Sequence, residues 1–421
     1  MRTLFHKLSP IIKVSTGTLV PDCGETLANA VVFVHEGKVV EICPAESVTK
    51  RRADRKVDLS GCLVHPGFVN AHCHLELSYL AGKMIPGLPF TDWVRDLVKK
   101  RGKASPSRVD SAIRKAIRRL IETGTTCVGD ISSTGLSTTH LREAGLRAVV
   151  FHETLGYNPS VAGVKLRELM DRVERASGSE FVTHGVSPHA VYSTSGELIK
   201  GAAEYAAMRK KPLAIHVAET MEENVFAKKG TGPFRDLLIR LGAFAPGFHP
   251  RSAPVAALQT LSALENALLI HMNFPARGDV TRIARAKAKV CLCPNSNRWF
   301  GRDMEHPLPK LLDKKVPVAL GTDSLASNMD LDMTKEAAAV AEDFPEIPSR
   351  DIFRMMTEDG ARALGLPEGF GALRAGAPFD AVAIYMDKPA GVAKPFEAII
   401  SPDRQLARVF IAGRELYRKR G

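Results

Sequence analysis

Eight short apolar segments recur between residues 67 and 324, and helix-like stretches of chain separate each from the next. The segments span residues 67–71, 125–131, 147–153, 181–190, 212–220, 267–273, 288–297 and 316–324. Apolar runs of this length are typical of buried strands, and strands that alternate with helices pair in parallel. Eight such units predict an α/β fold built around a closed (β/α)8 TIM barrel.

The two ends of the chain have a different pattern, in which strand signals are broken by turns. Near the N-terminus an apolar stretch is interrupted at Glu36 and Gly37, which predicts a hairpin. Neither end is long enough to bury a good core of its own. We therefore expect residues 1–60 and 371–421 to form one small composite β-sandwich, with the barrel of residues 61–370 inserted between them.

The first apolar segment ends in "HPGFVNAHCH", which places His72 and His74 two positions apart. Residues i and i+2 of a strand point to the same face, so the two imidazoles would project together. Two such imidazoles make half of a tetrahedral metal site. Histidines in a solvated loop would produce the same short motif, so the remaining ligands have to come from elsewhere in the chain.

Other strand ends also carry polar side chains, and the active site of such a barrel lies at the carboxyl ends of its strands. The residues at these ends are His184 and His189, His216 with Glu219, His271, and Asp323. Three imidazoles and a carboxylate suit one divalent metal ion, and we expect Zn²⁺, with Fe²⁺ as the alternative. Segment 181–190 contains no lysine that could bridge a second ion. Glu219 lies beyond the strand, where it could move protons between a metal-activated water and a leaving group.

Five motifs, "HPGFVNAHCH", "HVAET", "IHMN", "CPNSN" and "GTDS", occur along the chain in that order. With them the chain resembles the amidohydrolase superfamily, in its mononuclear deaminase branch, and "GALRAGAPFDAVAIY" resembles part of that family's composite β-sandwich. The resemblance implies that the metal ligands are His72, His74, His216 and Asp323, and that the catalytic residues are Glu219, His271 and Asp323. Glu219 would be the proton shuttle, and His271 would steady the attacking water.

Three further stretches, "HCHLELSYLAG", "PFTDWVRDLV" and "FHETLGY", resemble aminodeoxyfutalosine deaminases. This resemblance implies a hydrolytic deaminase of a 6-aminopurine nucleoside, which converts 6-amino-6-deoxyfutalosine to futalosine and ammonia in menaquinone biosynthesis. It implies substrate contacts by Glu76, Trp93, Glu153 and His189. The two glutamates could instead be solvated or supporting carboxylates.

Two other substrate classes use the same metal chemistry: S-adenosylhomocysteine or methylthioadenosine, and s-triazines. Asn295 in "CPNSN" stands where we expect arginine in the aminodeoxyfutalosine group. A benzoate on the substrate would need a cationic partner, for which Arg298 and Arg302 are candidates.

The net charge of +12 raises the alternative of nucleic-acid binding. Much of the excess lies in residues 95–120, whose second half has the apolar spacing of an amphipathic helix with its basic residues on the solvent face. We therefore expect a small-molecule nucleoside as the partner, and no nucleic acid. The family resemblance also implies a tendency to form a homodimer.

No apolar run approaches the eighteen residues of a membrane span, and the first residues lack a signal-peptide pattern. We expect no membrane partner and a cytoplasmic location. The seven cysteines are an odd number, which fits reduced thiols. Cys291 and Cys293 could bind metal, but we expect them to be core residues.

Overall fold

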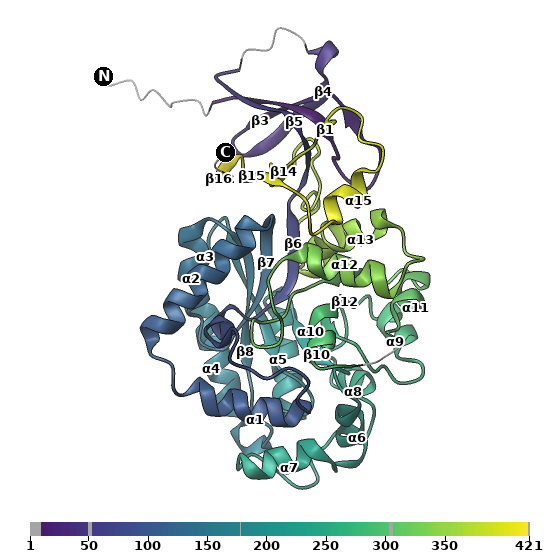
Figure 1. The fold of residues 1–421 in the computed structure, drawn as a ribbon. Coiled ribbons are helices and arrows are strands. Elements are labelled where there is room, and N and C mark those ends of the chain that lie inside the picture. The colour runs from purple at the N-terminus through teal and green to yellow at the C-terminus, as the bar shows by residue number, and fades with distance from the viewer. Residues whose placement is uncertain (1–9, 49–52, 177, 303–305, 420–421) are drawn as a thin grey trace, which may run out of the picture.

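A closed ring of eight parallel strands forms the centre of the computed structural model, which describes residues 10–48, 53–176, 178–302 and 306–419 (Figure 1). The strands are β6 (Phe68–Cys73), β7 (Thr125–Ser132), β8 (Arg147–Thr154), β9 (Val182–Pro188), β10 (Ala214–Val217), β11 (Leu268–His271), β12 (Lys289–Leu292) and β13 (Val318–Leu320). They pair as two four-stranded sheets, β6 to β9 and β10 to β13. Bridges from Cys73 to Asp323 and from Val186 to Leu213 join the two sheets at both seams. The predicted (β/α)8 barrel is confirmed, and the carboxyl ends of its strands meet at one mouth.

Helices cover the outside of the ring and its mouth (Figure 1). They are α1 (Phe90–Arg101), α2 (Pro106–Glu122), α3 (Ser137–Ala144), α4 (Ala162–Arg175), α5 (Gly196–Met208), α6 (Met221–Lys229), α7 (Pro233–Arg240), α8 (Pro254–Thr260), α9 (Asp279–Arg285), α10 (Pro294–Trp299), α11 (Leu308–Asp313), α12 (Met333–Asp343), α13 (Ser349–Met355), α14 (Glu358–Ala363) and α15 (Pro395–Ile400), with short 3₁₀ turns at Ala45–Ser47, Leu75–Leu80 and Pro159–Val161. The predicted basic helix is α2. It begins at Pro106 and is capped by Ser105, whose side chain accepts a hydrogen bond from the backbone N–H of Arg108. Its apolar face, which includes Ile113, Ile117 and Leu120, is buried in the main hydrophobic core.

Both ends of the chain contribute strands to one eight-stranded sheet, as expected from the predicted composite β-sandwich. Its strands are β1 (Ile12–Leu19), β2 (Leu27–Ala28), β3 (Ala30–His35), β4 (Lys38–Pro44), β5 (Arg55–Pro66), β14 (Ala381–Tyr385), β15 (Leu406–Ile411) and β16 (Arg414–Arg418). β14 pairs antiparallel with β5, with Ala383 opposite Val64, so the C-terminal strands extend the N-terminal part of the sheet. Buried side chains of both parts, among them Val32 and Phe410, share one hydrophobic cluster. β5 runs past residue 60 and leads through Gly67 into β6, the first strand of the barrel.

The predicted hairpin joins β3 to β4 through Glu36 and Gly37. Both residues have positive φ, at 49° and 76°, and His35 pairs with Lys38 across the turn. Two left-handed residues between paired strands match the twist of a two-residue hairpin. A side chain at Gly37 would also bring its Cβ within 2.7 Å of the carbonyl oxygen of Ala412, so glycine lets the hairpin pack against the turn between β15 and β16.

Gly321 allows the last barrel strand to close against the first. A Cβ atom at this position would lie 2.7 Å from Cys291 Sγ and 2.8 Å from His72 Cβ. Because glycine has no side chain, β13 can approach β6 closely enough for the backbone N–H of Asp323 to donate to the carbonyl oxygen of His72, at 3.1 Å. This approach brings Asp323 beside the first histidine pair.

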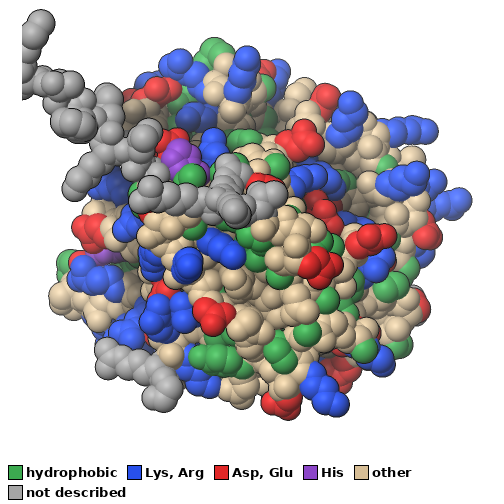
Figure 2. Space-filling model, turned by 90° about the horizontal axis from the view of Figure 1, so that it is seen from above, with side chains coloured by type: hydrophobic (Ala, Val, Ile, Leu, Met, Phe, Trp, Pro, Cys, Tyr) green, Lys and Arg blue, Asp and Glu red, His purple; other side chains and the backbone are tan. Residues whose placement is uncertain are grey.

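On the face seen in Figure 2, lysine and arginine side chains are interspersed with acidic and apolar ones. On α2, Arg114 pairs with Asp110, and Arg118 with Glu122.

In the part of the chain that the structure describes, no helix is both long and apolar enough to cross a membrane. All seven cysteines are free, and Cys291 and Cys293 are buried, as expected of core residues.

Candidate functional site

A cavity of about 210 Å³ opens at the carboxyl ends of the barrel strands. At one end it is lined by His74, His216, Glu219, His271 and Asp323, and elsewhere mainly by apolar side chains. His72 lies directly behind this lining and is completely buried. The structure therefore gathers the predicted metal ligands, the predicted proton shuttle and His271 at one place.

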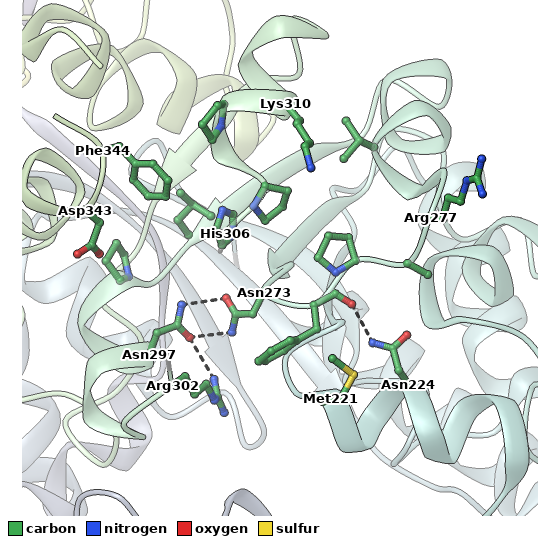
Figure 3. A pocket seen from close by; sticks show the side chains of 18 of the residues that line it. Met221, Asn224, Asn273, Arg277, Asn297, Arg302, His306, Lys310, Asp343 and Phe344 are labelled. Atoms are coloured by element: carbon green, nitrogen blue, oxygen red, sulfur yellow. Dashed lines mark hydrogen bonds between the residues drawn. The ribbon is translucent and has the colours of Figure 1, made fainter. Parts of the chain in front are cut away.

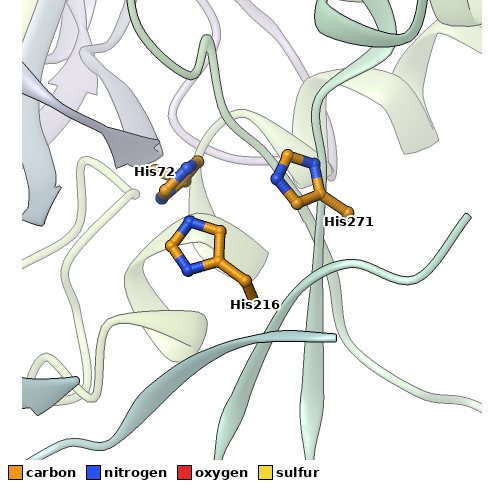
Figure 4. A group of neighbouring side chains, drawn as sticks. All are labelled: His72, His216 and His271. Atoms are coloured by element: carbon orange, nitrogen blue, oxygen red, sulfur yellow. The ribbon is translucent and has the colours of Figure 1, made fainter. Parts of the chain in front are cut away.

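The imidazoles of this cluster converge from separate strands. Figure 4 shows His72 of β6, His216 of β10 and His271 of β11 around a common space, and their ligand atoms lie within 4.8 Å of one another. His74 faces the same space, with its Nε2 3.3 Å from the Nε2 of His216. His72, His74 and Asp323 form a second group of ligand atoms within 4.8 Å.

Asp323 is held so that one oxygen faces the histidines. Its Oδ2 accepts hydrogen bonds from the hydroxyls of Ser296 and Ser327, each at 2.8 Å. Its Oδ1 is left 3.5 Å from His72 Nε2 and 3.9 Å from His74 Nε2. Burial alone would raise the pKa of Asp323, but the contact with His72 and the neighbouring histidines holds this pKa well below its usual range. The carboxylate is therefore ionised and directed at the imidazoles.

This set of side chains fits a divalent metal ion. His72 Nε2 is buried and has no hydrogen-bond partner among the described residues. Burial, together with the neighbouring imidazole of His72, lowers the pKa of His74 to about 4, and burial places that of His216 well below its ordinary value. Neutral imidazoles are the form that binds metal. Three imidazole nitrogens and one carboxylate oxygen are a donor set typical of zinc sites.

The backbone is left-handed at three of the strand ends that supply these groups. Ala218, His271 and Asp323 have φ values of 51°, 77° and 56°. None of them is glycine, so each conformation costs about 1–3 kcal/mol that the surrounding structure must offset. Strain of this kind clusters at functional sites, and here it turns the chain where β10, β11 and β13 reach the mouth of the barrel.

Glu219 lies next to the imidazole cluster and is only 4% exposed. Its Oε1 is 3.8 Å from His271 Nε2 and 3.2 Å from Arg302 Nη2. Burial raises the pKa of Glu219 to about 7, although the positive charge of Arg302 opposes this rise. A carboxyl group that titrates near neutral pH can both accept and return a proton, which is what general acid–base catalysis requires.

Arg302 is itself held by a network that the sequence did not indicate. Its Nη1 donates to Asn297 Oδ1 at 3.1 Å, and its guanidinium lies 4.4 Å from the ring centre of Phe300. The side-chain amides of Asn273 and Asn297 bond to each other in both directions, at 2.7 and 2.9 Å. Figure 3 shows this network at the edge of a second, larger cavity of about 1190 Å³. Arg302 thus connects Glu219 to the wall of that cavity.

The four predicted substrate contacts all line the catalytic cavity. The polar groups of two of them, however, already form hydrogen bonds within the protein. The carboxylate of Glu76 accepts hydrogen bonds from the side chains of Ser132 and Thr134 and from backbone N–H groups of the loop after β7. Trp93 Nε1 donates to the carbonyl oxygen of Ala326 at 3.0 Å. Glu76 therefore holds this loop in place, and Trp93 presents its ring to the cavity.

The other two retain atoms that face the cavity. Glu153 Oε2 accepts a hydrogen bond from Ser133 at 2.5 Å, while its Oε1 is buried, has no partner among the described residues and lies 4.0 Å from His189 Nε2. His189 Nδ1 lies 2.6 Å from the hydroxyl of Ser193. The second nitrogen of His189 and one oxygen of Glu153 are therefore placed to bind polar groups of a ligand.

Two sequence expectations fail in this region. Arg298 points away from the catalytic cavity, because its guanidinium pairs with Asp343 at 2.6 Å and with Glu342 at 2.9 Å on α12. His184 contacts His152, with ring nitrogens 3.1 Å apart, and it is not among the described residues that line the cavity. In both cases the position in the sequence is close to the site, but the side chain faces a different element.

The sequence profile of the amidohydrolase family matches residues 63–416 of this chain. Among curated proteins, a 5-methylthioadenosine/S-adenosylhomocysteine deaminase of Syntrophobacter fumaroxidans is 29% identical over 388 residues, covering 88% of this chain and 83% of the relative. An aminodeoxyfutalosine deaminase of Nitratiruptor is 27% identical over 357 residues, covering 82% and 85%.

Solved structures share the fold. Aminofutalosine deaminase of Helicobacter pylori, in complex with methylthio-coformycin, has a TM-score of 0.84 at 23% identity, covering 96% of this chain and 99% of its own. An adenosine deaminase of Xanthomonas campestris with bound zinc has a TM-score of 0.82 at 23% identity, covering 96% and 92%.

Proposed function

The chain belongs to the amidohydrolase family and is a hydrolytic enzyme, and on that premise we propose that it is a metal-dependent deaminase of a 6-aminopurine nucleoside. One observation carries this proposal. A buried glutamate, Glu219, lies beside His271 and the cluster of His72, His74, His216 and Asp323, at the end of a largely apolar cavity. Both curated relatives described above are named as deaminases, one of 5-methylthioadenosine and S-adenosylhomocysteine and the other of aminodeoxyfutalosine.

One divalent ion, which we propose to be Zn²⁺, would be held by His72, His74, His216 and Asp323. A metal ion in such a site supplies Lewis acidity, which makes water a nucleophile at neutral pH. The hydroxyls of Ser296 and Ser327 orient Asp323 for this role. Hydrogen bonds from neighbouring side chains to a metal ligand raise the affinity of the site for its metal.

Glu219 moves the protons, and His271 helps to position the attacking water. Ionised Glu219 accepts a proton from the attacking water, and His271 Nε2, 3.8 Å from Glu219 Oε1, helps to hold that water. The water oxygen adds to C6 of the purine while Glu219 delivers this proton to N1. Glu219 then takes the second proton from the hydroxyl now on C6 and passes it to the amino group. The exocyclic C6–N bond breaks, ammonia leaves and a 6-oxopurine remains.

For the substrate we propose 6-amino-6-deoxyfutalosine, converted to futalosine as a step in menaquinone biosynthesis. Glu153, in the "FHETLGY" stretch, and Trp93, in the "TDWV" stretch, line the cavity and would contact it. Methylthioadenosine, S-adenosylhomocysteine and s-triazines are the alternatives. The test compares ammonia release from these compounds: the proposal expects a preference of at least tenfold in kcat/KM for the benzoate-bearing nucleoside, which is about 1.4 kcal/mol of discrimination. A preference for methylthioadenosine or S-adenosylhomocysteine would overturn this substrate and leave the chemistry standing.

A further inference from the structure

The catalytic cavity has two chemically different ends. One carries the histidine cluster together with Glu219 and Asp323. The other is an apolar wall, which includes Phe90, Trp93, Leu97, Tyr192, Phe234 and Leu237. The rings of Tyr192 and Phe234 are stacked with their centres 4.1 Å apart, and the ring of Phe90 packs edge-on against Tyr192, so this wall is a cluster of aromatic side chains.

One permanent cation lines this cavity among the residues that the structure describes. It is Arg101, the last residue of α1. A guanidinium remains protonated at any physiological pH. Trp93, Leu97 and Arg101 follow one another at intervals of four residues along α1, so they share one face of the helix. The apolar wall therefore leads along α1 to a positive charge.

Arg101 is available to bind a ligand. Its side chain is exposed, and within the described chain it has no ion pair or hydrogen bond. Its helical neighbours do have partners: Arg95 pairs with Asp92 at 3.2 Å, and Lys100 with Asp96 at 2.6 Å.

We propose that Arg101 binds a carboxylate at the far end of the 5′ substituent and thereby selects nucleosides that carry an aryl carboxylate. This inference rests on the proposed function, because the purine must lie against Glu219 and His271 for the tail to run along the aromatic wall. Guanidinium groups bind carboxylates with strong, charge-assisted hydrogen bonds. A neutral methylthio tail would use the wall and leave Arg101 without a partner.

The experiment measures equilibrium binding by calorimetry to the metal-loaded enzyme. The ligands are a matched pair of 6-oxopurine nucleosides with a benzoate or a benzamide at the 5′ end, which no deamination can consume. The proteins are the wild type, Arg101→Gln and Arg95→Gln, the last being a control on the same helix outside the cavity lining. We expect the wild type and Arg95→Gln to bind the benzoate at least tenfold more tightly than the benzamide. Arg101→Gln should bind the two ligands equally, with its affinity for the benzamide unchanged within twofold.

Equal affinity of the wild type for the two ligands would overturn the role of Arg101, whatever the enzyme deaminates. The same holds if Arg101→Gln keeps the preference, or loses affinity for both ligands alike. Ammonia release from the corresponding 6-aminopurine nucleosides is measured separately. Failure of that reaction, with the tenfold binding preference intact, would count against the deaminase proposal and not against the carboxylate site.

Discussion

Arg302 Nη2 lies 3.2 Å from Glu219 Oε1, and both side chains are almost completely buried. A guanidinium this close favours the ionised form of the carboxyl group. Burial has the opposite and larger effect, and together they place the pKa of Glu219 at about 7. Arg302 therefore keeps Glu219 able to accept a proton at neutral pH.

Arg302→Gln should raise the pKa of Glu219 and move the acidic limb of the kcat/KM profile to higher pH. Because the pKa of Glu219 is already about 7, a rise of one unit lowers its ionised fraction at pH 7 from about one half to about one tenth, so we expect kcat/KM at pH 7 to fall about fivefold with metal content unchanged. Arg298→Gln is the matched control, because Arg298 pairs with Asp343 and Glu342 away from Glu219. A pH profile that keeps its position in Arg302→Gln would contradict this role.

The positions of the barrel strands were predictable because buried strands are short apolar runs bounded by turns. The residues at which these strands end were not predictable from the sequence. The segment predicted at 212–220 forms a strand only over Ala214–Val217, and that predicted at 316–324 only over Val318–Leu320. In both segments the chain turns through a left-handed residue, Ala218 or Asp323, a conformation that depends on tertiary contacts rather than on local propensity.

The residues of the site likewise divide into those that the sequence pattern predicted and those that depend on tertiary contacts. His72 and His74 were recognisable because the period of a strand places them on one face. Arg302 and Arg298 lie close together in the sequence, and nothing local separates their roles. The structure separates them because α10 ends at Trp299, after which the chain directs Arg302 back to Glu219. The position of Arg101 in the cavity depends on how α1 packs over the mouth, which no spacing encodes.

Stability should respond to pH through Glu219. Its pKa is raised from 4.5 to about 7 in the folded chain, so the folded state binds more protons than the unfolded state between these values. The free energy of unfolding therefore falls as pH rises through this window. Glu219→Gln removes this effect, and the variant should gain up to about 3 kcal/mol on the wild type between pH 4.5 and pH 7. Urea unfolding of metal-free protein at both pH values measures the gain, and a constant difference between the two proteins would contradict the raised pKa.

Metal content should approach one equivalent per chain in protein purified without added metal. His216→Ala and Asp323→Ala should each lose the ion, because each removes one of its proposed ligands. His35→Ala is the control, since His35 lies on β3 in the sheet formed by the chain ends. Elemental analysis of the four proteins makes the comparison, and a reproducible value of two in the wild type would exclude the single-ion site.

Gly321→Ala should destabilise the protein by several kcal/mol and weaken the metal site, because the new Cβ would overlap His72 and Cys291. Gly61→Ala is the matched control, since a Cβ at Gly61 meets no atom within 4 Å. Thermal unfolding and metal content should both fall in the first variant and stay unchanged in the second. Wild-type stability of Gly321→Ala would mean that the close approach of β13 to β6 is not required.

In the proposed mechanism, Glu219 drives hydrolytic loss of the 6-amino group from a purine nucleoside. The most direct test follows ammonia and the 6-oxopurine product together, with wild type and Glu219→Gln at equal metal content, on 6-amino-6-deoxyfutalosine and the other 6-aminopurine nucleosides. We expect one ammonia for each 6-oxopurine formed by the wild type, and a rate at least 100-fold lower in Glu219→Gln, the order that general acid–base catalysis supplies. If no 6-aminopurine nucleoside is consumed while an s-triazine is, or if Glu219→Gln turns over at the wild-type rate, the account is contradicted.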